Sequence, residues 1–288
     1  MDLRVAELLR EFELERIEVN LFRGESRDIG APQVFGGQVL GQALMAAYAT
    51  VESHDVHSLH AYFLRRGDFN APIVYHVDRA RDGHSFDARR VVAIQHGEQI
   101  FNLSASFQVR EPGLEHQVPM PDVPPPEELT DDGTPPAAVL EQLPEKQRRM
   151  FEQQRPFEFR VVEPFDYVRP QQMAATQHVW LRAVGRLPDD EHLHRCLLAY
   201  VSDYSLLATA VRPHGTAYLS GQLIMASIDH AMWFHRSPRV DDWLLYSMDS
   251  PSASGARGFA RGTLHSRDGR LIASTAQEGL IRVAKPQQ

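Results

Sequence analysis

The first apolar pattern along the chain indicates a short amphipathic helix at its start. Apolar side chains recur there between acids and arginines, at Leu3, Leu8, Leu9, Phe12 and Ile17. This spacing is typical of a surface helix that buries one face. Residues 20–32 follow as a loop or an edge segment.

Two later stretches are apolar almost all round. Residues 39–48 carry no charge and follow the dipeptide Gly36-Gly37, and residues 196–211 repeat the pattern with few polar positions. A helix without a polar face has no side to present to solvent. We therefore predict two buried helices, one in each half of the chain.

Each apolar stretch is followed by short runs of strand-like composition, separated by turn signals such as Arg81-Asp82-Gly83. The runs cover residues 57–64, 73–78, 85–93 and 99–109 in the first half, and 223–233, 243–249, 256–264 and 270–283 in the second. One buried helix followed by antiparallel strands predicts an α+β unit in which a sheet wraps a helix.

The two halves align with each other at an offset of 170 or 171 residues. His60-Ala61 meets His230-Ala231, and residues 73–78 meet residues 244–249. Few identities are shared, but the order and spacing of the elements agree, so we interpret the chain as two copies of one unit. Chance similarity between short β patterns is the alternative.

A proline-rich segment separates the two copies. Residues 119–144 hold eight of the nineteen prolines, so this exposed segment cannot build a sheet or a long helix. We predict an N-terminal unit at residues 1–117, a linker at 118–158 and a C-terminal unit at 159–288. A docking site for a proline-recognising partner is the alternative for the linker.

Composition narrows the class of protein. The 288 residues are 43% hydrophobic and 24% charged, which excludes wholesale disorder. The formal net charge of −8 argues against nucleic-acid binding. The charged N-terminus lacks a signal peptide, and no run reaches the ~18–20 apolar residues of a membrane helix. The single cysteine, Cys196, cannot form an internal disulfide, so we expect a soluble, cytoplasmic protein.

Several common catalytic motifs are absent from the sequence. There is no Gly-x-Ser-x-Gly elbow, His-Glu-x-x-His helix, P-loop or Gly-x-Gly-x-x-Gly turn. The closest histidine group, His54, His57 and His60, lacks the carboxylate or thiolate company of a metal site. We therefore predict no metal centre, and we interpret Cys196 as a core residue.

Three polar residues interrupt apolar segments of the second half. Asp203 lies inside the second apolar stretch, where burying a carboxylate alone is costly. It either caps a helix start together with Ser202 or serves as a catalytic carboxylate, and the two roles can coincide. Ser227 and Gln277 interrupt strand-like runs, and period-2 alternation puts Gln277 on the inner face. Singly, each is more often structural, but together the three can converge on one point.

At these three positions the sequence resembles the type II acyl-CoA thioesterases, the double-hotdog branch of the thioester hydrolases. The resemblance covers essentially the whole chain. It is carried by residues 33–38, 57–65, 81–86 and 88–91 in the first half, and by 202–203, 228–236, 243–247 and 277–279 in the second.

The resemblance implies two fused hotdog units that hydrolyse acyl-CoA to a free acid and CoA, with no metal or redox cofactor. The family's catalytic Asp, hydroxyl residue and Gln fall on Asp203, Ser227 and Gln277. The hydroxyl residue is threonine in some members, so Ser227 keeps the hydroxyl but lacks a methyl group. Peroxisomal members end in Ser-Lys-Leu, whereas this chain ends in Pro-Gln-Gln, so we expect no peroxisomal address.

The chemistry is consistent with these residues. Asp203 would accept a proton from water that Ser227 and Gln277 orient. Gly36 and Gly37 before the first buried helix would let backbone amides approach the developing oxyanion.

In the first unit the register pairs Ser227 with His57 and Gln277 with Ser106, and no acid lies at the head of that unit's helix. We therefore predict one functional site per chain, in the second half.

The remaining candidates concern substrate binding. We expect contacts with the substrate from Gly36, Gly37, His60, Arg81, Arg90 and Arg257. Arg89 and Arg261 are further candidates, because guanidinium groups suit the phosphates of CoA. Solvated strand edges are the alternative for each arginine.

Other interpretations remain open from the sequence. Asp203 could attack the thioester directly and form a mixed anhydride. The same fold also serves hydratases and dehydratases, but these use an Asp–His pair, and the adjacent Asp229 and His230 point to opposite faces of a strand. A non-catalytic acyl-CoA sensor is the third possibility. The expected partners are acyl-CoA and further copies of the chain in a homo-oligomer (a dimer or tetramer), without nucleic acid or a membrane segment.

Overall fold

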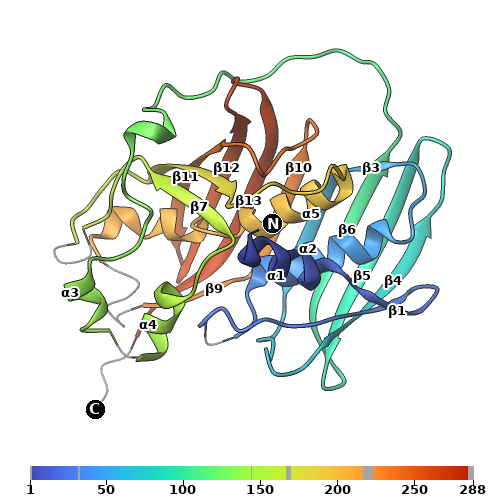
Figure 1. The fold of residues 1–288 in the computed structure, drawn as a ribbon, viewed down its shortest axis with the longest axis horizontal. Helices are drawn as coiled ribbons and strands as arrows, with labels where there is room; N and C mark the ends of the chain where they lie inside the picture. Colours follow the sequence, from blue (N-terminus) through green and yellow to red (C-terminus); the bar gives the residue numbers. More distant parts are fainter. Residues whose placement is uncertain (1, 32, 144, 167–169, 217–222, 285–288) are drawn as a thin grey trace.

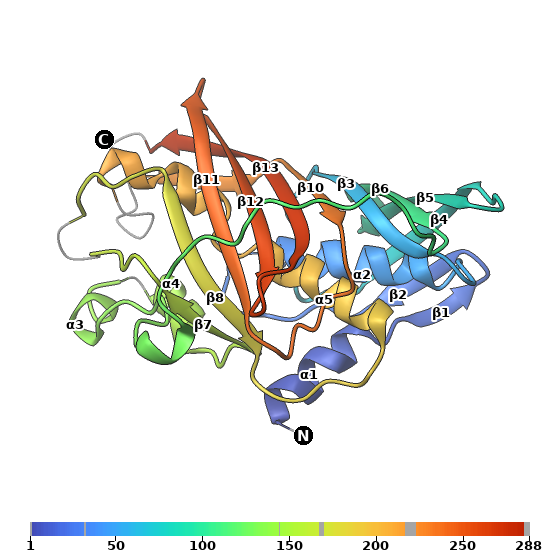
Figure 2. The same cartoon turned by 90° about the horizontal axis from the view of Figure 1, so that it is seen from above.

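Two helices lie side by side against the concave face of one large antiparallel sheet. The computed structural model describes residues 2–31, 33–143, 145–166, 170–216 and 223–284. Helices α2 (Gly36–Tyr48) and α5 (Glu191–Ser202) lie near the centre of the molecule (Figure 1). From above, the sheet arches over both helices, and α1 (Leu3–Phe12) lies on their other side (Figure 2). The predicted α+β architecture, two units that each wrap a helix in a sheet, is confirmed.

The contact between α2 and α5 is unusually close because α2 carries two glycines one turn apart. A Cβ atom on Gly41 would lie 2.9 Å from the backbone carbonyl of Cys196, and one on Gly37 would overlap the carbonyl of Tyr200. Since position 37 faces 200 and position 41 faces 196, the helices run antiparallel. The start of α2 therefore lies against the end of α5.

The sheet has thirteen strands within the described residues. Its order is β1-β2-β4-β5-β6-β3-β10-β13-β12-β11-β8-β7, with β9 paired to β13. The first half contributes β1 (Glu15–Glu18), β2 (Leu21–Gly24), β3 (Asp55–Phe63), β4 (Ile73–Arg81), β5 (Phe86–Gln95) and β6 (Glu98–Gln108). The second half contributes β7 (Phe157–Val161), β8 (Thr176–Ala183), β9 (Leu223–Ser227), β10 (Asp229–Phe234), β11 (Leu244–Ser254), β12 (Arg257–Ser266) and β13 (Leu271–Val283).

Strands β3 and β10 join the two halves into one sheet. The residues that the sequence offset makes equivalent pair crosswise, His60 with Ala231 and Ala61 with His230. A two-fold axis between the strands requires this reciprocal pattern. The repeat inferred from the sequence is therefore visible in the register of the sheet.

Some predicted elements have different limits. Ile17 lies in β1 rather than in the first helix. The second apolar stretch is helical only to Ser202 and continues as a 3-10 turn, η2 (Leu207–Ala210). The predicted strand at 223–233 is divided between β9 and β10, and β7 and β8 were not predicted at all.

The proline-rich connection is packed against the second half rather than free of it. It contains the short helices η1 (Pro126–Glu128), α3 (Ala137–Leu140) and α4 (Glu145–Glu152) but no long one, as predicted. The indole of Trp180 donates a hydrogen bond to the carbonyl of Pro124 at 2.9 Å. Met120, Val123 and Leu129 pack on a small cluster around Trp180. Within the described residues, no helix is long and apolar enough to cross a membrane.

The close helix contact predicts a large cost for any side chain at position 41. We expect Gly41→Val to lower the free energy of unfolding by about 3 kcal/mol, at the upper end of overpacked cores, because the backbone of α5 blocks the added carbons. Gly113→Val is the control, since a Cβ there meets nothing within 4 Å. Urea unfolding midpoints measure the difference, and equal midpoints for the two variants would contradict the packing described here.

Candidate active site

Asp203 lies at the end of α5, not at its start. Its backbone is still helical (φ −79°, ψ −12°), while Asp190 caps the start by accepting hydrogen bonds from the amides of His192 and Leu193. The interpretation of Asp203 as a helix-start cap is therefore wrong. The chain turns away at Ser205, which has a left-handed backbone (φ 66°).

The three polar residues singled out from the sequence meet at one point. The Gln277 amide donates to Asp203 Oδ1 at 2.7 Å and to Ser227 Oγ at 3.1 Å, and Ser227 Oγ donates to the same Asp203 oxygen at 3.4 Å. The strand register explains the meeting. Ser227 on β9 pairs with Gly279 on β13, two residues beyond Gln277 and on the same face.

Gln277 also carries an unused acceptor. Its side chain is 1% exposed, and its Oε1 atom has no hydrogen-bond partner among the described residues. Leaving a buried acceptor unpaired costs about 1–3 kcal/mol. Such a group is expected where a ligand or a reacting water supplies the missing donor.

The start of α2 faces the Asp203 carboxylate. Phe35 precedes the helix and offers no side-chain cap; its carbonyl accepts from the Gln38 and Val39 amides, so the Gly36 and Gly37 amides remain available to other acceptors. The Gly37 amide interacts with the carboxylate, and a Cβ on Gly36 would lie 2.7 Å from Asp203 Oδ2. Glycine at both positions therefore allows the positive end of the helix dipole to reach the acid.

Opposing effects set the charge state of Asp203. Burial raises the pKa of its carboxyl to about 6, against hydrogen bonds from Gln277, the Gly37 amide and Ser227 that lower it. A carboxylate in this range is charged at neutral pH yet basic enough to accept a proton.

Buried side chains hold the end of α5 in place. Tyr246 donates its hydroxyl to the carbonyl of Ser202 at 3.0 Å, and His230 Nε2 lies 3.0 Å from Ser202 Oγ. Burial lowers the pKa of His230 to about 4, so the imidazole is neutral. On the far side of the turn, Gln177 donates to the carbonyl of Ser205 at 2.8 Å. The sequence prediction missed Gln177, which stands between Thr176 and His178 and so interrupts no apolar run.

Two cavities open onto Asp203. The site cavity, of about 620 Å³, is bordered by Gly36, Asp203 and Ser227 and by the arginines at positions 27, 66 and 155. The rim cavity, of about 230 Å³, shares those three residues and adds Arg65. Sequence reasoning did not select these arginines, although the pair Arg65-Arg66 at a strand end is a visible signal.

The structure does not bring the other predicted binding residues to this site. His60 is exposed on the outer face of the sheet, with its ring 5.3 Å from that of Trp233. Arg90 and Arg257 are also exposed, and their strand positions alternate with inward-facing residues, so both lie on the outer face. Arg81 is exposed at the end of β4.

The two further arginine candidates are engaged elsewhere. The buried Arg89 donates to Thr50 Oγ1 at 2.8 Å and to the Thr50 carbonyl at 2.9 Å, which secures the chain just after α2. Arg261 pairs with Asp249 at 2.7 Å. Of the predicted binding residues, only Gly36 and Gly37 lie beside Asp203.

The first unit has no equivalent carboxylate. His57 and Ser106, the counterparts of Ser227 and Gln277, lie 2.8 Å apart. Ala49 follows α2 where Asp203 follows α5, and the ring of Tyr48, the last residue of α2, stacks on His192 at a centroid distance of 4.2 Å. Burial lowers the pKa of His57, which favours a neutral ring.

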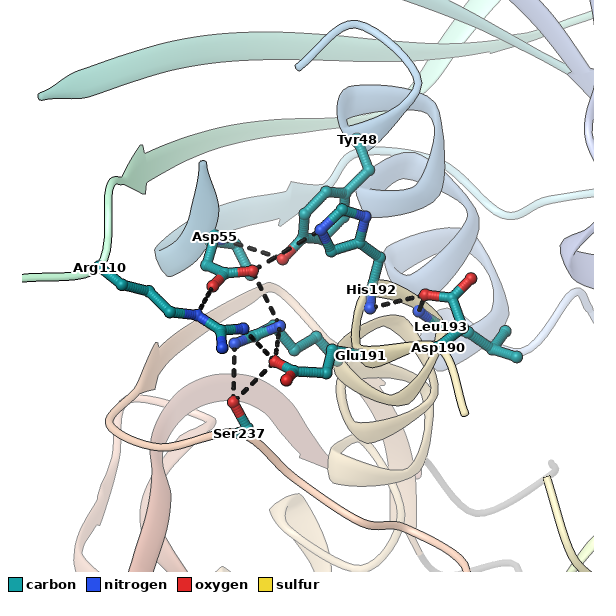
Figure 3. A network of polar contacts seen from close by, with 10 residues as sticks. Tyr48, Asp55, Arg110, Asp190, Glu191, His192, Leu193 and Ser237 are labelled. Atoms are coloured by element: carbon teal, nitrogen blue, oxygen red, sulfur yellow. Dashed lines mark hydrogen bonds and ion pairs between the residues drawn. The ribbon is translucent and has the colours of Figure 1, made fainter. Parts of the chain in front are cut away.

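Ion pairs occupy this second helix junction instead. Asp55 accepts a hydrogen bond from Arg110 at 2.6 Å and forms an ion pair with Arg195 at 3.0 Å, and Arg110 also pairs with Glu191 (Figure 3). Ser237 donates to Glu191 at 2.8 Å. Because Asp55 and Arg110 come from the first half and the others from the second, the network ties the halves together.

Comparison with known proteins assigns both halves of the chain to related families. Residues 23–108 match the family described as "Acyl-CoA thioesterase N-terminal domain", and residues 146–280 match "Acyl-CoA thioesterase". The chain is 44% identical over 282 residues to "Acyl-CoA thioesterase 2" of Haemophilus influenzae, covering 96% of this chain and 98% of that protein. It is 43% identical over 295 residues to human "Acyl-coenzyme A thioesterase 8", covering 99% and 92%.

Solved structures show the same architecture. The acyl-CoA thioesterase II TesB2 of Mycobacterium marinum superposes with a TM-score of 0.78 at 40% identity, covering 98% of this chain and 99% of that one. A tesB protein of Mycobacterium avium subs paratuberculosis gives a TM-score of 0.80 at 32% identity, covering 97% and 99%. A hot dog fold protein of Alicyclobacillus acidocaldarius, at 20% identity, shares the fold.

The contacts of Asp203 predict how its acidity responds to Gln277. We expect Gln277→Leu to raise the Asp203 pKa above about 6, because the hydrogen bond from the amide favours the charged carboxylate. A pH titration of the carboxyl ¹³C signal measures this, with Asp203→Asn identifying the signal. Gln117→Leu, outside the site, is the control. An unchanged pKa in Gln277→Leu would show that the hydrogen bond is not made in solution.

Proposed function

Because the chain belongs to the acyl-CoA thioesterase family, we propose that its Asp203, Ser227 and Gln277 activate the water that cleaves the thioester. The chain hydrolyses acyl-CoA to a free acid and CoA. The observation that carries the mechanism is the shared contact of the three side chains at Asp203 Oδ1. It supports the proposal because an acid, a hydroxyl and an amide that contact one another can all contact one water molecule.

Each side chain has a defined part in the proposed reaction. The Asp203 carboxylate accepts a proton as the water oxygen attacks the thioester carbonyl carbon. Ser227 Oγ holds the water in line, and Gln277 Oε1, which has no partner in the part of the chain that the structure describes, accepts its second hydrogen. The carbon–sulfur bond then breaks, the acid leaves, and the CoA thiolate takes up the proton held by Asp203.

The first amides of α2 are the proposed oxyanion donors. Of these, the Gly36 amide is the main candidate, because Gly36 borders the cavity that contains Asp203, whereas the Gly37 amide already interacts with the Asp203 carboxylate. Donors fixed before the reaction stabilise the charge that develops on the carbonyl oxygen without reorganising. The first half of the chain thereby contributes directly to a site whose acid belongs to the second half.

The structure gives no support to a hydratase with an Asp–His pair. His230 is fully buried against Ser202 beneath the end of α5, while Asp229 accepts a hydrogen bond from the Glu278 amide at 2.6 Å. The two side chains lie on opposite faces of β10, as strand alternation requires.

We also propose a homo-oligomer and a cytoplasmic location. Tyr62 and Trp233 are 53% and 37% exposed on the outer face of β3 and β10, which offers an apolar surface to a second copy. The buried thiol of Cys196 is compatible with a reducing compartment.

The proposed base makes Asp203→Asn the decisive variant. We expect kcat to fall by about 10²–10⁴-fold, the usual contribution of a general base, with an unchanged circular dichroism spectrum. Asp249→Asn, on the outer face, is the control and should keep full activity. Thiol release from acyl-CoA measures both. Substantial turnover by Asp203→Asn would contradict the proposed role.

Water attack and direct attack by Asp203 differ in which molecule contains the oxygen atom from solvent after one turnover. We expect a single turnover in heavy-oxygen water to label only the released acid, since Asp203 forms no covalent bond in the proposed path. Mass spectrometry of the peptide that contains Asp203 provides the second readout. Label in that carboxylate would establish a mixed anhydride and contradict water attack.

A further inference from the structure

A third cavity lies behind the site, against the proline-rich connection. This linker cavity has a volume of about 220 Å³. It shares part of its wall with the site cavity, at Gly133, Phe151, Arg155, Tyr204, Ser205 and Ala208. The two cavities are therefore neighbours, with Ala208 of η2 bordering both.

The linker cavity combines an apolar wall with charged side chains. Phe159 and Val161 on β7, Val179 on β8 and Phe151 on α4 line it, and so do Asp131, Asp132, Arg155 and Arg212. The rings of Phe159 and Tyr204 lie 5.4 Å apart. Apolar walls of this kind favour an alkyl chain over a charged group, because burying a chain methylene contributes about 0.8 kcal/mol.

On the side of Asp203 away from the linker cavity, arginine side chains provide a site suited to an anion. Arg66 borders both the rim cavity and the site cavity, is exposed, and makes no ion pair within the part of the chain described. Its neighbours are engaged, Arg65 with Glu98 at 3.0 Å and Arg27 with Glu11 at 3.0 Å. An arginine without an acidic partner is suited to the phosphates of CoA.

We propose that the acyl chain of the substrate extends past Ala208 into the linker cavity, while the CoA moiety lies toward Arg66. This orientation rests on the proposed function, because it takes Asp203 as the reacting point. The substrate class is then acyl-CoA with a chain long enough to pass Ala208. The connection between the halves thereby forms one wall of the site that selects chain length.

A bulky side chain at position 208 tests the orientation. Ala208 is exposed and borders both cavities, so Ala208→Phe narrows their junction without entering the core. We expect kcat/KM for dodecanoyl-CoA to fall more than tenfold, with the value for butanoyl-CoA changing less than twofold. Ala253→Phe, at an exposed position outside these cavities, is the matched control.

Two results would overturn the orientation: an equal fall for both substrates in a folded Ala208→Phe protein, or no change for either. If Ala208→Phe does not fold, Phe151→Ala decides instead. It removes part of the apolar wall and should raise KM severalfold for dodecanoyl-CoA only; equal effects on both substrates would again overturn the proposal. Retained butanoyl-CoA hydrolysis shows that the chemistry is intact, so failure here is distinguishable from failure of the Asp203 mechanism.

Discussion

The close antiparallel packing of α2 on α5 is the constraint on which the rest of the structure depends. Gly37 and Gly41 remove the side chains that would separate the helices, and the carbonyls of Tyr200 and Cys196 occupy the space. The same contact sets the positive end of one helix against the acid that ends the other. Packing and electrostatics at the site therefore have a common origin, and a change that separates the helices alters both.

The two helix junctions show how a duplicated fold can diverge. Both place the start of one helix against the end of the other, as the two-fold relation of β3 and β10 requires. One junction has a carboxylate with a raised pKa in an open cavity, whereas the other has a stacked Tyr48 and an ion-pair network around Asp55. The exposed pair of this network, Arg110 with Glu191, contributes modestly to stability. Arg195 is buried, so the clearer effect of the network is to join the halves.

Residue patterns predicted the architecture and the meeting of Asp203, Ser227 and Gln277 better than they predicted which other residues lie beside Asp203. The alternation of β13 was sufficient to place Gln277 inside, and the repeat predicted two equivalent units. The end of α5 was not predictable, because apolar residues continue to position 211. The helix ends shortly before Ser205, where the backbone turns into the left-handed region and Gln177 hydrogen-bonds the Ser205 carbonyl. Arg90 and Arg257 were predicted to bind CoA because of their charge. Charge alone does not indicate which face of the sheet a residue occupies. The strands β7 and β8 lie in a proline-rich part of the sequence, so their alternation of buried and exposed residues was not recognised.

The packed connection between the halves also changes the thermodynamics of the site. Because the acid comes from one half and the helix amides from the other, two separate chains would assemble the site only by a bimolecular encounter. A tether replaces that encounter by an intramolecular one, so the effective concentration of one half near the other does not depend on the protein concentration. Dilution therefore does not take the site apart, and the integrity of a single copy is independent of how many copies surround it.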